Sequence, residues 1–152
     1  MLPLGRMSAS LGGARAVSSL VVLQVPSEIV FRDLATRTVA AICKLATRDA
    51  SIGEQFSHEL VSAVGEAFNN SVLHAYEHHS GEITLRITYD DCQVSVEILD
   101  HGDSFDFDAA PALDLAEPQE SGMGLFIIRS FVDEVSYEPG SPNCLRMKKR
   151  FA

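Results

Sequence analysis

Three polar residues recur at four-residue intervals on a predicted helix over residues 53–76: Glu66, Asn70 and His74. Each step of four residues turns by only about 40° around an α-helix, so the three share one face. An Asn oxygen suits Mg²⁺, which prefers hard oxygen ligands, and a carboxylate one turn away could accept a proton from an attacking hydroxyl. An amphipathic helix can also simply turn such a stripe to water. The adjacent pair Asn69 and Asn70 favours the functional interpretation, because Asn has poor propensity inside helices.

A second motif, Asp100-His101-Gly102-Asp103-Ser104, directly follows a predicted strand. A carboxylate at a strand end beside a glycine can accept a hydrogen bond from an exocyclic amine such as that of adenine. Asp-x-Gly is also common in ordinary turns, so this motif is weak by itself.

A third motif, Ser121-Gly122-Met123-Gly124-Leu125, opens a predicted helix. Glycine lets the backbone approach a ligand closely, and a helix start presents free N–H groups and partial positive charge. Ser121 could instead be a simple helix cap with incidental glycines nearby. The position of the motif after a long acidic loop favours a phosphate site.

Hydrophobic spacing and turn residues predict the elements that position these motifs. A strand over residues 20–25 ends at Pro26, and Ser27 is the expected N-cap of a helix that runs to Thr47. Further elements are expected at 53–76 (helix), 82–89 and 92–99 (strands), 124–131 (helix), and 134–137 and 144–151 (strands). This order predicts an α/β (α+β) two-layer sandwich with the helices on one face of a mixed, mostly antiparallel sheet.

Composition limits the possible functions. The length of 152 residues suits one domain, which we expect over 20–152 after a loosely ordered leader over 1–19. A net charge of −9 argues against direct binding to nucleic acid. No run of about 20 apolar residues predicts a membrane span. Three distant cysteines without a CxxC pair fit reduced thiols, so we expect a cytoplasmic protein.

Taken in order, the motifs resemble those of the GHKL ATPase superfamily, and most of all the bacterial anti-sigma factor serine kinases of the RsbW and SpoIIAB type. Residues 66–76 resemble the N box, at its Glu, at the Asn four residues later and at His-Ala-Tyr. Residues 100–104 resemble the G1 box, Asp-x-Gly-x-Gly. Residues 122–126, followed by Asp-Glu-Val at 133–135, resemble the G2 box. The likeness covers about residues 20–151.

The resemblance implies the Bergerat ATP-binding fold, with ATP or ADP and Mg²⁺ as cofactors. It implies Asp100 on adenine, Asn70 on the metal and Glu66 as catalytic base, beneath a lid over residues 103–121. The other nucleotide-binding residues it implies are Gly102, Ser104, Ser121, Gly122, Met123, Gly124 and Leu125. It further implies phosphorylation of a serine on a STAS-domain antagonist, sequestration of a sigma factor, and a homodimer.

Two departures from the family pattern leave an alternative open. Ser104 replaces the second glycine of the G1 box, which would weaken nucleotide binding if φ > 0 were needed there. No Lys or Arg lies between Arg86 and Arg129, so the lid offers no cation to a transferring phosphoryl group. The alternative is a nucleotide-dependent partner-switching module without kinase turnover. A detached histidine kinase domain is disfavoured, since no phosphoacceptor helix precedes residue 20 and His74 lies within the nucleotide helix.

Overall fold

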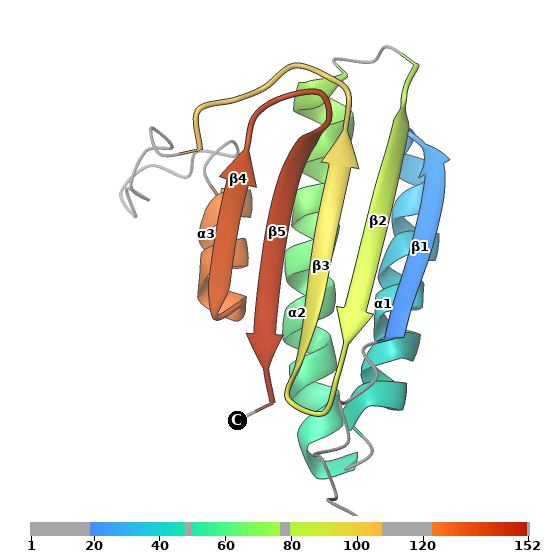
Figure 1. The fold of residues 1–152 in the computed structure, drawn as a ribbon, viewed down its shortest axis with the longest axis vertical. Helices are drawn as coiled ribbons and strands as arrows, with labels where there is room; N and C mark the ends of the chain where they lie inside the picture. The colour runs from blue at the N-terminus through green and yellow to red at the C-terminus, as the bar shows by residue number, and fades with distance from the viewer. Residues whose placement is uncertain (1–18, 48–49, 77–79, 108–122, 152) are drawn as a thin grey trace, which may run out of the picture.

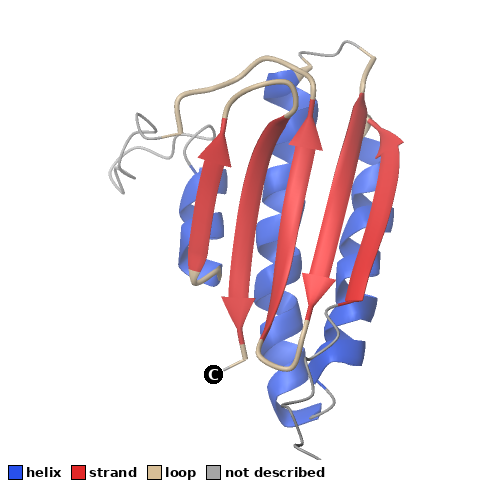
Figure 2. Cartoon of the chain, viewed as in Figure 1, coloured by secondary structure: helices blue, strands red, loops and turns tan. Residues whose placement is uncertain are grey.

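The computed structural model describes residues 19–47, 50–76, 80–107 and 123–151. In these ranges, three α-helices pack against one face of a five-stranded sheet (Figures 1 and 2). The elements are β1 (Ser19–Pro26), a 3₁₀ turn (Ile29–Phe31), α1 (Arg32–Thr47), α2 (Ala50–Asn70), a π-helical turn (Ser71–Ala75), β2 (Glu82–Tyr89), β3 (Gln93–Asp100), α3 (Met123–Phe131), β4 (Glu134–Glu138) and β5 (Asn143–Arg150). The predicted two-layer sandwich is confirmed.

The strands follow the order β1-β2-β3-β5-β4, and every pairing between described neighbours is antiparallel. Alternation along the strands sends one set of side chains to the helices and the other to the open face. The pairing of β3 with β5 sets Asp100 opposite Asn143 at the end of both strands. This register brings two polar residues together that lie 43 positions apart in the chain.

The core lies between the sheet and α2, the central helix in Figure 1. The largest fully buried side chains come from both layers: Phe68, Leu60, Ile83, Leu85, Ile87, Ile98, Ile128, Met147, Val39, Val64, Val94 and Val96. Full burial of one such aliphatic or aromatic side chain stabilises the fold by about 1.5–3 kcal/mol relative to exposure. The apolar face of α2 is therefore anchored in the core, and its polar residues Glu66 and Asn70 keep a fixed place relative to the sheet.

An ion pair and a hydrogen bond from Lys149 connect the sheet to the helices away from these polar residues. The Lys149 Nζ lies 2.8 Å from a Glu59 carboxylate oxygen and donates a hydrogen bond to the Phe131 carbonyl at 2.7 Å. These contacts join β5, α2 and the end of α3. The hydrogen bond from Lys149 lowers the pKa of Glu59 below its usual range.

The helix boundaries differ from the predictions in two places. Ser27 is not the N-cap of α1, because the chain first makes the 3₁₀ turn and the α-helix begins only at Arg32. The Ser27 hydroxyl is buried without a hydrogen-bond partner, while its N–H donates to the Gly81 carbonyl. The predicted second helix begins earlier, at Ala50, and changes to π-helical geometry after Asn70. Within the described ranges, no helix is long and apolar enough to cross a membrane.

Candidate functional site

A pocket lies where α2 and the π-helical turn meet the ends of β3, β4 and β5. The space between its walls measures about 300 Å³, part of which is open to solvent. The lining residues are Ala67, Asn70, Ser71, Ala75, Asp100, Phe105, Tyr137 and Leu145. The wall is mostly apolar with a few polar groups, an arrangement typical of ligand pockets.

Asp100 supplies the carboxylate of this pocket and is only 6% exposed. One of its oxygens, Oδ1, accepts hydrogen bonds from Asn143 Nδ2 at 2.9 Å and from the Gly102 N–H at 3.1 Å. The other, Oδ2, accepts from the Ser71 hydroxyl at 3.3 Å. A carboxylate has about four acceptor positions, so Asp100 keeps capacity for one more donor from a ligand.

Asn143 orients this carboxylate and was missed by the sequence analysis. Its side chain is fully buried, and its Nδ2 donates to Asp100 and, at 2.9 Å, to the Gly102 carbonyl. Its Oδ1 accepts from the Ser104 hydroxyl and from the Gly140 N–H. One amide thus fastens the end of β3, the loop after it and the β4–β5 turn. A sequence signal does exist, since Asn is depleted in strands.

Two residues of the second motif have defined structural roles. A Cβ on Gly102 would lie 2.2 Å from the Ala75 carbonyl oxygen, so only glycine fits where this loop crosses the π-helical turn. The next residue, Asp103, donates its N–H to the same oxygen at 2.7 Å. Ser104 is held by Asn143 through its hydroxyl. The predicted cost of Ser104 for nucleotide binding stays a prediction.

Glu66 and Asn70 face the first turn of α3. A Cβ on Gly124 would lie 3.3 Å from the Glu66 Oε2 and 3.4 Å from the Asn70 Oδ1. Gly124 therefore leaves open the space into which both polar side chains point, and a larger residue would fill it. The first and third motifs, about 50 positions apart in the sequence, meet here in the fold.

The remaining predicted residues divide into three groups. Leu125 is half-buried and packs against the core, and Met123 is the first residue of α3. Ser121 and Gly122 lie outside the described residues, as does most of the predicted lid. His74 is exposed, and the pocket does not include it, because the π-helical turn interrupts the α-helical stripe after Asn70.

Comparison with known proteins agrees with this geometry. Residues 32–149 match the family described as Histidine kinase-like ATPase domain. The chain is 33% identical to an anti-sigma F factor of Caldanaerobacter subterraneus over 60% of its own length and 68% of the relative's. It is 34% identical to the serine-protein kinase RsbW of Bacillus subtilis, again over 60% of its length, although the match spans only 62% of that relative. An anti-sigma F factor of Clostridium beijerinckii is 32% identical over 74% of this chain and 82% of the relative.

A solved structure has the same fold. It is the histidine kinase domain of a blue-light activated histidine kinase from Erythrobacter litoralis, with a TM-score of 0.52 over 84% of this chain and 62% of the other. At 16% identity, this likeness concerns the fold alone. The chain therefore belongs to the histidine kinase-like ATPase family, in the group that contains the anti-sigma F factors and the serine-protein kinase RsbW.

Proposed function

We propose that this protein binds ATP, phosphorylates a serine on a protein antagonist, and sequesters a sigma factor when that antagonist is absent. The observation that carries the proposal is the convergence of Glu66 and Asn70 on the space beside Gly124, next to the Asp100 pocket. Relatives named anti-sigma F factor and serine-protein kinase RsbW support both the kinase and the anti-sigma activity.

In this proposal the adenine amine donates to the free acceptor position of Asp100, and the phosphates extend toward the start of α3. Helix N-termini favour anions, which suits a chain whose net charge is −9. Asn70 Oδ1 is a hard oxygen donor and would hold Mg²⁺, whose other ligands would be phosphate oxygens and water. The bound ion would neutralise charge that develops on the phosphoryl oxygens. Among the described residues, no three His, Cys, Asp or Glu side chains form a separate metal cluster.

Glu66 is the proposed general base. Its carboxylate takes the proton of the substrate serine hydroxyl as that oxygen bonds to the γ-phosphorus. The bond from phosphorus to the β–γ bridging oxygen breaks, and ADP leaves. The proposed protein substrate is a STAS-domain antagonist of the sigma factor, and phosphorylation would release it from the kinase.

We expect Glu66→Gln to bind nucleotide with near wild-type affinity but to transfer phosphate about 10²–10⁴-fold more slowly, because the amide cannot accept the proton. Transfer of labelled phosphate from ATP to the antagonist measures the rate, and calorimetry measures binding. Glu54→Gln, an exposed position near the start of α2, is the matched control and keeps full activity. Wild-type protein that binds ATP without any transfer would contradict the kinase proposal and favour the partner-switching alternative.

A homodimer formed through the outer edge of β1 is part of the proposal. In the described chain no strand pairs with this edge, and its eight residues include no charge. Exposed edge strands normally carry charges or are covered, because their free N–H and C=O groups recruit other strands. Leu20 and Val22 are also 51% and 56% exposed.

Val22→Lys should shift the protein from dimer to monomer in sedimentation experiments, because it places a charge on this edge strand. Val22→Thr adds no charge and should leave the dimer intact. A monomeric wild type would contradict the proposal.

A further inference from the structure

Two aromatic rings outside the three motifs form one side of the pocket. Phe105, from the loop after β3, and Tyr137, from β4, both line it. Their ring centroids lie 4.3 Å apart with a tilt of 33°, and the Phe105 N–H donates to the Tyr137 hydroxyl at 3.3 Å. The two rings therefore pack together as one surface, which we call the aromatic wall (Phe105 and Tyr137).

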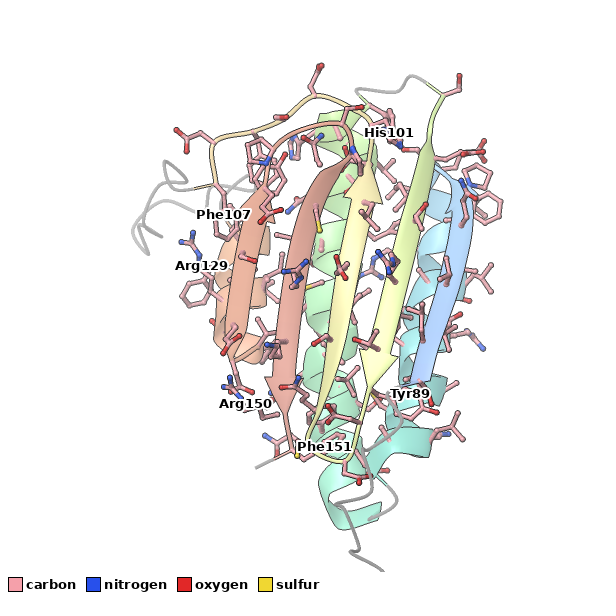
Figure 3. The ribbon with its side chains drawn as sticks, viewed as in Figure 1. Tyr89, His101, Phe107, Arg129, Arg150 and Phe151 are labelled. Atoms are coloured by element: carbon pink, nitrogen blue, oxygen red, sulfur yellow. The ribbon has the colours of Figure 1, made fainter. Side chains whose placement is uncertain are left out.

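A second pair of side chains holds the aromatic wall from outside the pocket. The Phe107 ring stacks on the Tyr137 ring, with the two ring centroids 6.2 Å apart. The Arg129 guanidinium lies 4.6 Å from the Phe107 ring centroid. Arg129 also donates to the Phe107 carbonyl at 3.2 Å. Figure 3 labels both residues where the loop passes α3 and β4. Phe107 does not line the pocket, so it supports the aromatic wall without facing a ligand there.

The chemistry of the pocket suits a flat aromatic ring. Besides the aromatic wall, the lining includes the small side chains of Ala67 on α2 and Ala75 on the π-helical turn, and Asp100 supplies a free acceptor position. A flat ring that stacked on Phe105 would keep its edge free to donate a hydrogen bond to Asp100. Alkyl chains gain no such directional stacking, whereas heteroaromatic bases do.

We propose that Phe105, backed by Tyr137, stacks on the purine ring of the nucleotide and positions the base so that its exocyclic amine meets Asp100. This inference rests on the proposed function, because it assigns a contact within the same nucleotide site. It gives the first residues of the loop that follows Asp100 a direct role in base recognition. Phe105 is thus the proposed stacking residue, and Tyr137 packs against its ring and lines the same pocket.

The affinity test compares neighbouring phenylalanines. Phe105→Ala should weaken ATP binding roughly ten-fold or more, because alanine leaves no ring on which the base can stack. Phe105→Tyr keeps the ring and should retain affinity. Phe107→Ala removes a ring that supports the aromatic wall but does not line the pocket, so it should weaken ATP binding less than Phe105→Ala does. Isothermal calorimetry gives the affinities, and thermal melting checks that each variant folds.

A spectroscopic test reports the contact itself. The chain has no tryptophan, so Phe105→Trp carries a single indole at the pocket. ATP should quench its fluorescence through stacking, while Phe107→Trp should respond little. An unquenched Phe105→Trp that still binds ATP would overturn the inference, as would wild-type affinity in Phe105→Ala. If wild-type protein binds no ATP, the proposed function itself fails, which is a separate and recognisable outcome.

Discussion

Asn70→Ala is expected to abolish Mg²⁺-dependent nucleotide binding while the protein stays folded. The Asn70 amide lines the pocket and points into the space beside Gly124, where it is the proposed protein ligand of the metal. Loss of contacts that merely support a metal ligand costs about 10–100-fold in affinity, so loss of the ligand itself should cost at least that much. Calorimetry with Mg-ATP and with ATP plus EDTA measures the difference between the variant and wild type.

Asn69→Ala is the matched control, since it removes the same side chain at the adjacent position. Asn69 does not line the pocket, and its Oδ1 is buried without a hydrogen-bond partner. This substitution should therefore leave Mg-ATP affinity unchanged. Unchanged affinity in Asn70→Ala would refute the assignment of Asn70 to the metal, whatever the control shows.

Local patterns in the sequence predicted most of the fold, because the type of each helix or strand follows from the spacing of apolar residues within that segment. The alternation in β2 and β3 and the four-residue spacing in α2 each reflect one buried face, and both predictions are confirmed. The meeting of the first and third motifs beside Gly124 was expected only from the family resemblance. Helical spacing alone did not distinguish a site from a solvated surface, because polar residues on one face serve either purpose.

The parts that escaped prediction depend on contacts between distant segments. Asn143 matters because of the register of β3 with β5, and nothing near position 143 encodes the partner at position 100. Phe105 and Tyr137 are 32 positions apart, and their contact likewise depends on how distant segments are brought together by the fold. Ser27 has the residue type of an N-cap, but the 3₁₀ turn after it moves the start of α1 to Arg32. Ser27 is a residue type that commonly caps helices, but the chain does not enter an α-helix directly after it, so the predicted cap is wrong.

Asn143→Ala is expected to destabilise the fold and to remove nucleotide binding together. The truncation leaves Asp100, Ser104 and the backbone groups of Gly102 and Gly140 without the amide that joins them. Buried polar groups left without partners cost about 1–3 kcal/mol each where water cannot replace the bond, so a loss of roughly 2–4 kcal/mol is expected. Urea denaturation measures the free energy of unfolding, and Cys144→Ser, the next residue with its side chain on the opposite face of the sheet, is the control.

Asn143→Asp keeps the size and shape of the side chain but removes its N–H donors, so it distinguishes hydrogen bonding from space filling. It keeps an acceptor for Ser104 and Gly140 but sets a second carboxylate where Nδ2 now lies, 2.9 Å from Asp100. Two carboxylates this close cannot both ionise easily, so the pKa of one should rise in the folded state above the unfolded value of about 3.9. A raised folded pKa means that stability is present at low pH and lost as pH rises through that pKa. The deficit of Asn143→Asp against wild type should therefore shrink as pH falls from 7 toward 4, whereas that of Asn143→Ala should not. A parallel pH dependence in both variants would show that Asn143 fills space rather than orienting Asp100 through its donors.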